Sequence, residues 1–265
     1  MIIDLKPIEK YGLTTDRVKH IKAVTRGVLN HRLFPTLTRQ EQIVLLLASQ
    51  YHDVGYSEEL THNVGKSQKH YIHGYLHLKA RGVANQVCRL VLHHTYARDL
   101  ERIKFNDLTI FNKNPLLPQD AKLLFILNDS DMTTNGHGET VTKDIRLKDI
   151  VNRYGEAHFV TLHFKKALQL HVMEEQKYIT EETVQSNIND NTDILKDIMR
   201  DIASSKRGYL YHQSSKTIEP YVQYEQAVSL PTDTYSLFSA IELTCLLAIG
   251  FDLLYPNHLM LRKAQ

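Results

Sequence analysis

Residues 38–56 of this 265-residue chain, TRQEQIVLLLASQYHDVGY, decide its fold class. Thr38 is followed three residues later by Glu41, which is the capping-box pattern that starts a helix. The apolar residues 43–48 fill the body of that helix, and Gly55 lies where the helix would stop. The stretch therefore predicts a buried helix that carries a polar His-Asp pair at its C-terminal end.

That pair, His52 and Asp53, closes an apolar run. An imidazole and a carboxylate are costly to bury without partners, because each loses its hydration. A divalent metal ion would offset that cost. We therefore expect the chain to supply further metal ligands.

The composition is that of an ordinary globular protein. With 265 residues, 42% hydrophobic and 23% charged, the chain is expected to form one large domain or a domain with a smaller appendage. The net charge is +2 and the basic residues are scattered, which argues against binding to nucleic acid or to an anionic membrane. Cys88 and Cys245 lie among apolar residues, which favours core packing in a reducing compartment over a disulfide.

Neither end of the chain predicts a membrane segment. Residues 1–6 lack the apolar stretch of a signal peptide. The longest apolar stretch, 237–255, contains Glu242 and Asp252 and is better interpreted as a buried helix. We expect a cytoplasmic protein.

Helical periodicity dominates the first two thirds of the chain. The expected helices begin at Thr15-Asp16 and run through Val28, and then cover 38–53, 69–80, 84–96, 119–131, 142–153, 156–177 and 190–204. Residues 57–69 are expected to form a loop and 99–117 a connection. Residues 207–230 are rich in Tyr, Val and Thr and predict short strands, followed by a last helix at 237–254.

We accordingly expect a mainly α fold with a soft boundary near 181–186. The first part, 1–182, would be a helical metal-binding domain. The second part, 183–265, would be a smaller helical or α+β extension that contains the short strands.

The chain has 15 histidines, most of them between His20 and His94. Six side chains lie at or near the ends of expected helices and are candidate metal ligands: His20, His52, Asp53, His70, His94 and Asp131. Imidazole nitrogens combined with carboxylate oxygens suit a first-row metal such as Mn, Fe, Co, Ni or Zn. Because adjacent residues on a helix face different ways, a shared metal at the His-Asp pair requires that the helix end there.

Several alternatives stay open for these positions. His20 also fits a surface position on an amphipathic helix. Neighbouring side chains compete for the other places: His73 and His77 with His70, His93 with His94, and Asp129 with Asp131. Asp129 also fits the role of a hydrogen-bonding partner of a metal-bound histidine.

The order His20, His52-Asp53 and Asp131 resembles the signature of the HD-domain metal-dependent phosphohydrolase superfamily, in a bacterial branch. Five segments carry the resemblance, which covers about residues 15–175: RVKHIKAV (17–24), HDVGYSEEL (52–60), HYIHGYLHLKARG (70–82), LVLHHTYAR (90–98) and NDSDMTTNGHGETVTKDIRLKDIVNRYG (128–155). The chain lacks the Gly-Tyr-Pro motif of the related cyclic-dinucleotide phosphodiesterases and has Tyr56 where they place a lysine. Cyclic dinucleotides are therefore not expected as substrates.

The resemblance implies an HD-domain helical bundle that binds one or two divalent ions, of Mn, Fe, Co, Ni, Zn or Mg. It implies that the first metal is held by His20, His52, Asp53 and Asp131. His70 and His94 would bind a second metal or contact the substrate phosphate. Asp53, His70 and His94 would then be the catalytic residues.

The leading hypothesis is a metal-dependent phosphohydrolase that attacks a phosphomonoester or a nucleotide with a metal-activated water. Arg98, Lys66 and Lys69 are candidate phosphate contacts, with a solvated surface position as the alternative for each. The partner would be a small phosphorylated substrate. No Gly-x-Ser-x-Gly elbow or Walker-type loop supports another hydrolase chemistry.

Two further hypotheses come from other classes. The first is a non-catalytic, metal-stabilised sensor or interaction module, in which the helix at 237–254 docks a partner or forms a homodimer. The second is an oxygenase, since some helical di-iron proteins with His and Asp ligands resemble this domain.

Overall fold

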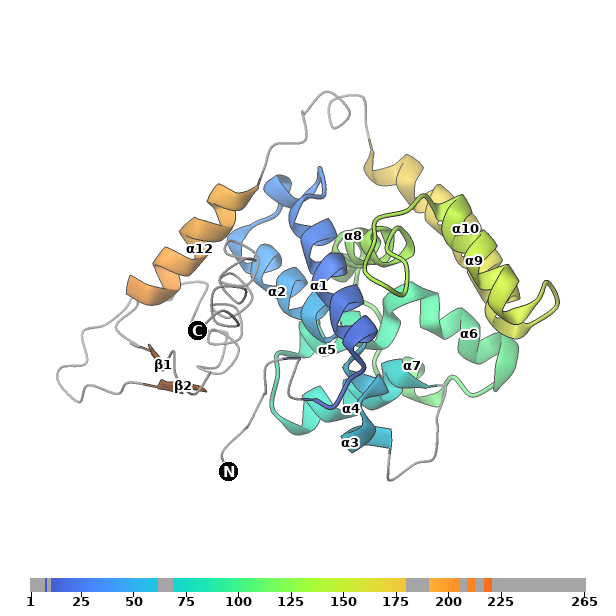
Figure 1. The fold of residues 1–265 in the computed structure, drawn as a ribbon, viewed down its shortest axis with the longest axis horizontal. Helices are drawn as coiled ribbons and strands as arrows, with labels where there is room; N and C mark the ends of the chain where they lie inside the picture. Colours follow the sequence, from blue (N-terminus) through green and yellow to red (C-terminus); the bar gives the residue numbers. More distant parts are fainter. Residues whose placement is uncertain are drawn as a thin grey trace, which may run out of the picture.

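The described part of the chain is built from helices, with one short hairpin (Figure 1). The computed structural model describes residues 8, 11–61, 69–179, 191–204, 209–212 and 217–220. The helices are α1 (Thr15–Leu29), α2 (Arg39–Tyr51), α3 (Glu58–Thr61), α4 (His70–Ala80), α5 (Asn85–His93), α6 (Ala97–Lys104), α7 (Thr109–Lys113), α8 (Ala121–Met132), α9 (Lys143–Tyr154), α10 (Phe159–Tyr178) and α12 (Thr192–Ser204). Four 3₁₀ turns connect them: η2 (Phe34–Thr36), η3 (Val54–Tyr56), η4 (His94–Tyr96) and η5 (Pro118–Asp120). The mainly α fold predicted from the sequence is confirmed.

The start of α2 follows the predicted capping box. The Thr38 side chain accepts a hydrogen bond from the backbone N–H of Glu41, and the Glu41 carboxylate accepts one from the N–H of Thr38 at 2.8 Å. The start of α1 was predicted one residue too late, because Thr14 is the cap and its hydroxyl accepts from the N–H of Arg17 at 3.3 Å.

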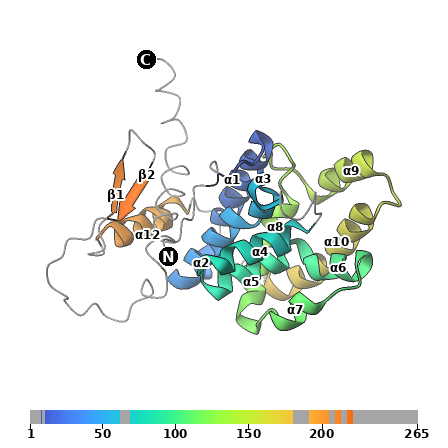
Figure 2. The same ribbon diagram turned by 90° about the horizontal axis from the view of Figure 1, so that it is seen from below.

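The centre of the core is α2, which packs against α1, α5 and α8 (Figures 1 and 2). Residues 43–48 are all fully or almost fully buried. Burial of one leucine or isoleucine side chain contributes about 1.5–3 kcal/mol. This run therefore fixes the position of α2, and with it the position of the His-Asp pair that follows.

The expected helix over 84–96 is shorter than predicted. The helix α5 ends at His93, and Thr95 (φ 48°) and Tyr96 (φ 56°) then adopt left-handed conformations. Non-glycine residues adopt this conformation only when surrounding contacts hold them. Side-chain contacts of these two residues, described below, provide that restraint.

The expected connection over 99–117 was wrong, since it contains α6 and α7. The buried face of α6 includes Glu101, which is fully buried and accepts hydrogen bonds from Tyr71 (2.7 Å) and Lys69 (3.2 Å). A buried carboxylate interrupts the apolar pattern that identifies a helix from sequence. The loop expected over 57–69 begins with the short helix α3, and residues 62–68 lie outside the described part.

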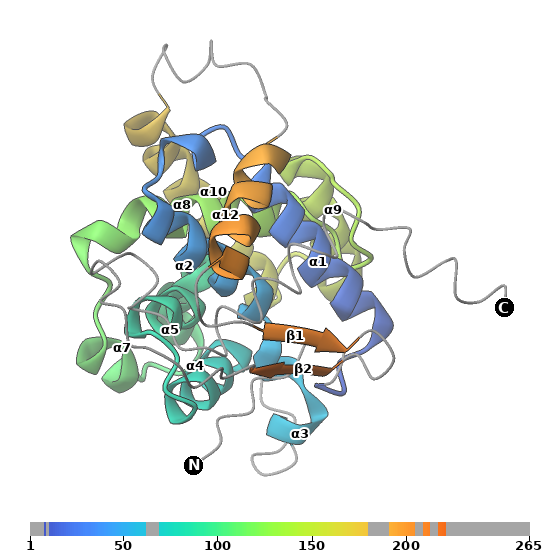
Figure 3. The ribbon, with the colours of Figure 1, turned by 90° about the vertical axis from the view of Figure 1, so that its left-hand side faces the viewer.

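The helix α12 lies beside α2 (Figure 3) and contributes side chains to the same hydrophobic core. Leu195 and Ile198 are buried in the main hydrophobic cluster, and the amide of Asn191 donates to the Leu29 carbonyl at 2.7 Å. Its range agrees with the helix predicted over 190–204.

Short strands were expected within 207–230, and two are present. Strand β1 (Tyr209–His212) pairs antiparallel with β2 (Thr217–Pro220), with Tyr209 opposite Pro220. The predicted helix at 237–254, Cys245 and the boundary at 182/183 lie outside the described residues.

Among the described helices, none is both long enough and apolar enough to cross a membrane. Cys88 is buried, as its apolar neighbours predicted.

Candidate metal centre

Six polar side chains from separate parts of the chain meet between the central helices. They are His20 on α1, His52 and Asp53 after α2, His70 at the start of α4, His94 in η4 and Asp131 on α8. They form two groups, each with ligand atoms within 4.8 Å of one another: His20, His52 and Asp131, and Asp53, His70 and His94. The structure thus brings together all six candidate ligands.

The carboxylate of Asp53 connects the two groups. Its Oδ1 lies 3.4 Å from Nε2 of His70 and 3.7 Å from Nε2 of His94. Its Oδ2 lies 3.6 Å from Nε2 of His20 and 3.5 Å from Nε2 of His52. Each oxygen therefore faces a different pair of imidazoles, as a carboxylate that bridges two ions would.

Three of the histidines are fixed in a single orientation by the backbone. Their Nδ1 atoms lie 2.9, 2.7 and 2.6 Å from carbonyl oxygens, for His20, His52 and His94 respectively. A carbonyl oxygen can only accept, so each Nδ1 carries the proton and donates. In the neutral imidazole, the lone pair then lies on the Nε2 that faces the cluster.

The donor set fits a metal ion on independent grounds. The Nε2 of His52 is buried and has no hydrogen-bond partner among the described residues. An inward-facing, unpartnered lone pair with the other nitrogen bound to a carbonyl is the arrangement of metal-bound histidines. Buried His and Asp groups of this kind can hold a divalent cation.

Both carboxylates are held in the charged form. Burial favours a higher pKa for Asp53, but Arg17 and the surrounding histidines outweigh it and keep the pKa well below its usual range. The pKa of Asp131 is also lowered against the effect of burial, by the close contact of its carboxylate with His20 and by the proximity of His52. Both residues are therefore available as anionic ligands at neutral pH.

Burial lowers the pKa of two of the imidazoles and so favours their neutral form. It lowers the pKa of His52, and it lowers the pKa of His70 well below the usual value. The pKa of His94 is raised although burial opposes this, because Asp53 lies close to it. Neutral His52 and His70 are in the protonation state that metal binding requires.

One edge of the centre is organised by Arg17. Its guanidinium forms an ion pair with Oδ2 of Asp53 and lies 4.2 Å from the centroid of the Tyr56 ring. The Tyr56 ring in turn stacks on the imidazole of His70 at 4.1 Å. Because Tyr56 is 40% exposed, this edge of the centre borders solvent.

Asp131 is held by the left-handed segment after His94. The hydroxyl of Thr95 donates to Oδ2 of Asp131, and the backbone N–H of Thr95 donates to Oδ1 of Asn128 at 2.6 Å. Tyr96 is held by a hydrogen bond from its hydroxyl to Glu174 at 2.7 Å. The strained backbone therefore places a hydroxyl on a candidate ligand.

The residues that were considered as alternative metal ligands contact other groups. Asp129 contacts His171 (2.8 Å) and Lys143 (2.7 Å), His77 contacts the hydroxyl of Tyr11 (3.1 Å), and His93 contacts the carbonyl of Asn114 (2.9 Å). These three residues and His73 lie outside the two groups.

Two of the three cations named from the sequence as phosphate contacts have protein partners in the structure, and their role toward a phosphate stays a prediction. Lys69 pairs with Glu101 at 3.2 Å, and Arg98 donates to Asn112 at 3.1 Å. Lys66 lies outside the described residues.

Sequence reasoning missed three residues around the centre. Arg17 had a usable signal, because it lies three residues before His20 on the same helix face. Thr95 and Arg146 had none, since no local pattern encodes the hydrogen bond from Thr95 to Asp131 or the electrostatic interaction of Arg146 with Asp131.

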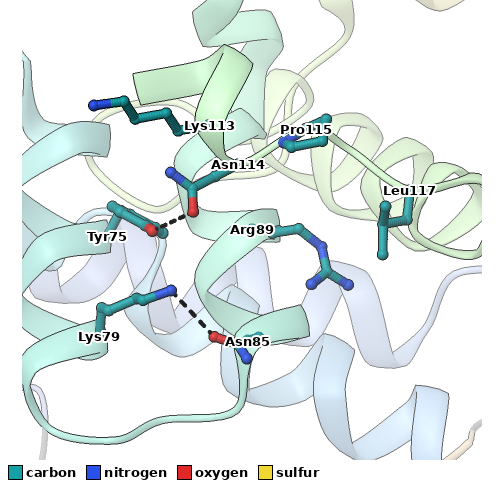
Figure 4. A pocket seen from close by; sticks show the side chains of 8 residues that line it. All are labelled: Tyr75, Lys79, Asn85, Arg89, Lys113, Asn114, Pro115 and Leu117. Atoms are coloured by element: carbon teal, nitrogen blue, oxygen red, sulfur yellow. Dashed lines mark hydrogen bonds between the residues drawn. The ribbon is translucent and has the colours of Figure 1, made fainter. Parts of the chain in front are cut away.

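A separate pocket of about 230 Å³ lies between α4, α5 and the segment after α7 (Figure 4). It shares no residue with the six-residue cluster. Its polar groups are largely paired: Arg89 binds Asp120 through Nε (2.6 Å) and Nη2 (3.1 Å), and the hydroxyl of Tyr75 donates to Asn114 (2.6 Å). The cluster, not this pocket, is the candidate functional site.

Comparison of the chain with protein-family models, with curated proteins and with solved structures found no match. Fold and site together define a helical protein with a buried His/Asp cluster that can hold a metal ion.

Proposed function

We propose that this protein is a metal-dependent phosphohydrolase that acts on a phosphomonoester or a nucleotide. In this proposal the six-residue cluster would hold two divalent ions, with Asp53 as a ligand of both. The observation that carries the proposal is the division of the two Asp53 oxygens between the two groups of imidazoles. The resemblance of five sequence segments to HD-domain phosphohydrolases supports it.

The mixed nitrogen and oxygen ligands suit Mn, Fe, Co, Ni or Zn. When bound, such ions supply a water of lowered pKa as nucleophile and polarise a phosphoryl oxygen.

The residues of the chain would prepare the centre for that chemistry. Arg17 keeps Asp53 ionised and oriented, and the hydroxyl of Thr95 orients Asp131. Three backbone carbonyls keep imidazole lone pairs directed inward. These contacts exist before substrate binds, so little reorganisation would be needed during reaction.

His70 differs from the other histidines of the cluster. Its Nδ1 is buried without a partner in the described part of the chain, and its side chain is 15% exposed, against 1% or less for His20, His52 and His94. It is thus the least restrained imidazole and the one nearest to solvent. Where it does not ligate a metal, it is the best placed of these histidines to contact a substrate phosphate.

The test is the variant Asp53→Ala, with Asp129→Asn as the matched control. Metal content and hydrolysis of nucleotides and simple phosphomonoesters would be measured for both and for the unmodified protein. Asp53→Ala is expected to lose metal and hydrolysis together, while Asp129→Asn retains metal, because Asp129 lies outside the cluster. Full hydrolysis by metal-bearing Asp53→Ala protein would overturn the mechanism.

The same experiment distinguishes the other hypotheses. Stoichiometric metal without turnover of any phosphoester would favour the non-catalytic sensor or interaction module. Iron-dependent oxygen consumption would favour an oxygenase.

A further inference from the structure

Arg146 is a guanidinium without a full set of partners beside the candidate metal centre. It lies near the start of α9, and its side chain is only 13% exposed. Its Nη1 lies 3.3 Å from Oδ2 of Asp149, but its Nε is buried and has no hydrogen-bond partner in the described structure. A buried N–H without an acceptor is costly, and such groups call for an explanation.

The unpaired edge of Arg146 is the one suited to an oxyanion. With Nη1 engaged, the free edge consists of Nε and Nη2, which present two parallel N–H donors. The same protein shows this geometry in use, since Arg89 binds the carboxylate of Asp120 through Nε and Nη2 at 2.6 and 3.1 Å.

Two carboxylates and two other guanidiniums interact electrostatically with Arg146. Arg146 and Arg17 are both close enough to Asp131 to interact with it, and they repel each other. Asp149 is shared, because Arg153 binds the same oxygen at 2.6 Å. Burial and the neighbouring cations Arg153 and Arg17 accordingly lower the pKa of Arg146. A multiply charged anion at this position would relieve the repulsion.

The helix α9 carries an exposed aromatic ring at its C-terminal end. Tyr154, at its C-terminal end, is 47% exposed and interacts electrostatically with Tyr56, which stacks on His70.

We infer that Arg146 binds the phosphate of the substrate through its Nε and Nη2 edge, and that the substrate is a dianionic phosphomonoester. The inference rests on the proposed function, since it names the group that the centre would receive. The dianion is favoured over a monoanionic diester because two guanidiniums, Arg17 and Arg146, interact electrostatically with Asp131 in addition to any bound cations.

The test is a calorimetric titration of the full-length, metal-loaded protein with inorganic phosphate. Arg146→Gln is expected to weaken phosphate binding by about 10- to 100-fold, the effect of losing charge-assisted hydrogen bonds. The matched control is Arg153→Gln. Arg153 lies on the same helix as Arg146 and binds the same carboxylate, that of Asp149, but its side chain is 46% exposed. It is expected to change phosphate affinity by less than about threefold.

Arg146→Lys provides a second variant that keeps the charge but loses the planar fork. It is expected to fold and to bind phosphate more weakly than the unmodified protein. Equal phosphate affinity in the unmodified protein and in folded Arg146→Lys or Arg146→Gln would overturn the inference.

Hydrolysis separates this inference from the proposed function. With p-nitrophenyl phosphate, Arg146→Gln is expected to raise KM, and the unmodified protein is expected to prefer this monoester to bis(p-nitrophenyl) phosphate. Turnover with an unchanged KM in Arg146→Gln would refute the role of Arg146 and leave the hydrolase proposal standing. Phosphate binding that depends on Arg146 without turnover of any ester would refute the hydrolase proposal alone.

Discussion

The backbone carbonyl of His70 lies directly against Gly55, because a Cβ atom built on Gly55 would come within 1.8 Å of that oxygen. Gly55 belongs to the turn η3, immediately after Asp53, and η3 packs against the start of α4. This close approach brings His70 within 3.4 Å of Asp53. The glycine is therefore required by a backbone contact that assembles the site.

The variant Gly55→Ala is expected to displace the start of α4 and to separate His70 from Asp53. Overpacking of this kind costs about 1–3 kcal/mol of folding free energy. Thermal unfolding should occur at a lower temperature, and metal affinity should fall. Gly136→Ala is the control, since a Cβ there would have no neighbour within 4 Å. Unchanged stability and metal content in Gly55→Ala would contradict the role given to this contact.

The two groups of ligands predict how many ions each variant keeps. The unmodified protein is expected to bind two divalent ions per chain, and His94→Ala or His20→Ala to bind one, because each change removes a ligand from only one group. Elemental analysis after dialysis gives the count. The two-ion arrangement is refuted if His94→Ala and His20→Ala both retain the full number found in the unmodified protein.

The hydroxyl of Thr95 is expected to tune metal affinity through Asp131. Removal of such a partner of a metal ligand typically costs about 10- to 100-fold in affinity. Thr95→Val should show this loss in a competition titration with a chelator, whereas Thr95→Ser retains the hydroxyl and should bind nearly as tightly as the unmodified protein. Equal affinities of the valine and serine variants would show that the contact has no such role.

Stability of the metal-free protein is expected to fall in mild acid. Burial lowers the pKa of His163, whose Nε2 donates to the Tyr96 carbonyl at 3.2 Å. Since the unfolded chain takes up this proton near pH 6.5, the stabilisation is present above that pH and is lost as the pH falls toward the lower folded-state pKa.

The variant His163→Gln isolates this contribution, because glutamine can donate the same hydrogen bond but does not titrate. Its thermal unfolding midpoint should fall less between pH 7.5 and 5.5 than that of the unmodified protein. Identical pH dependence of the two proteins would exclude a contribution from His163.

The sequence was most informative where local chemistry determines structure. The capping box at Thr38 and Glu41 and the apolar run after it correctly predicted α2. The polar residues at helix ends correctly identified the side chains that meet, because buried polar groups need partners wherever they lie.

Contacts between distant residues could not be predicted in this way. The buried Glu101 concealed α6, since its partners Lys69 and Tyr71 come from another part of the chain. Gly55 was interpreted as a helix stop, and only the position of His70 shows why a side chain is excluded there. The orientation of Thr95 toward Asp131 depends on a left-handed backbone for which the sequence gives no signal.

We propose that the buried imidazoles and carboxylates around Asp53 form a metal site. The most direct measurement removes divalent cations from the full-length protein with a chelator and then titrates Mn²⁺ back, following the unfolding temperature and the bound metal together. Saturable binding that raises the unfolding temperature is expected, because only the folded chain assembles the ligands. A protein that retains no Mn²⁺ and unfolds at the same temperature throughout the titration would contradict it.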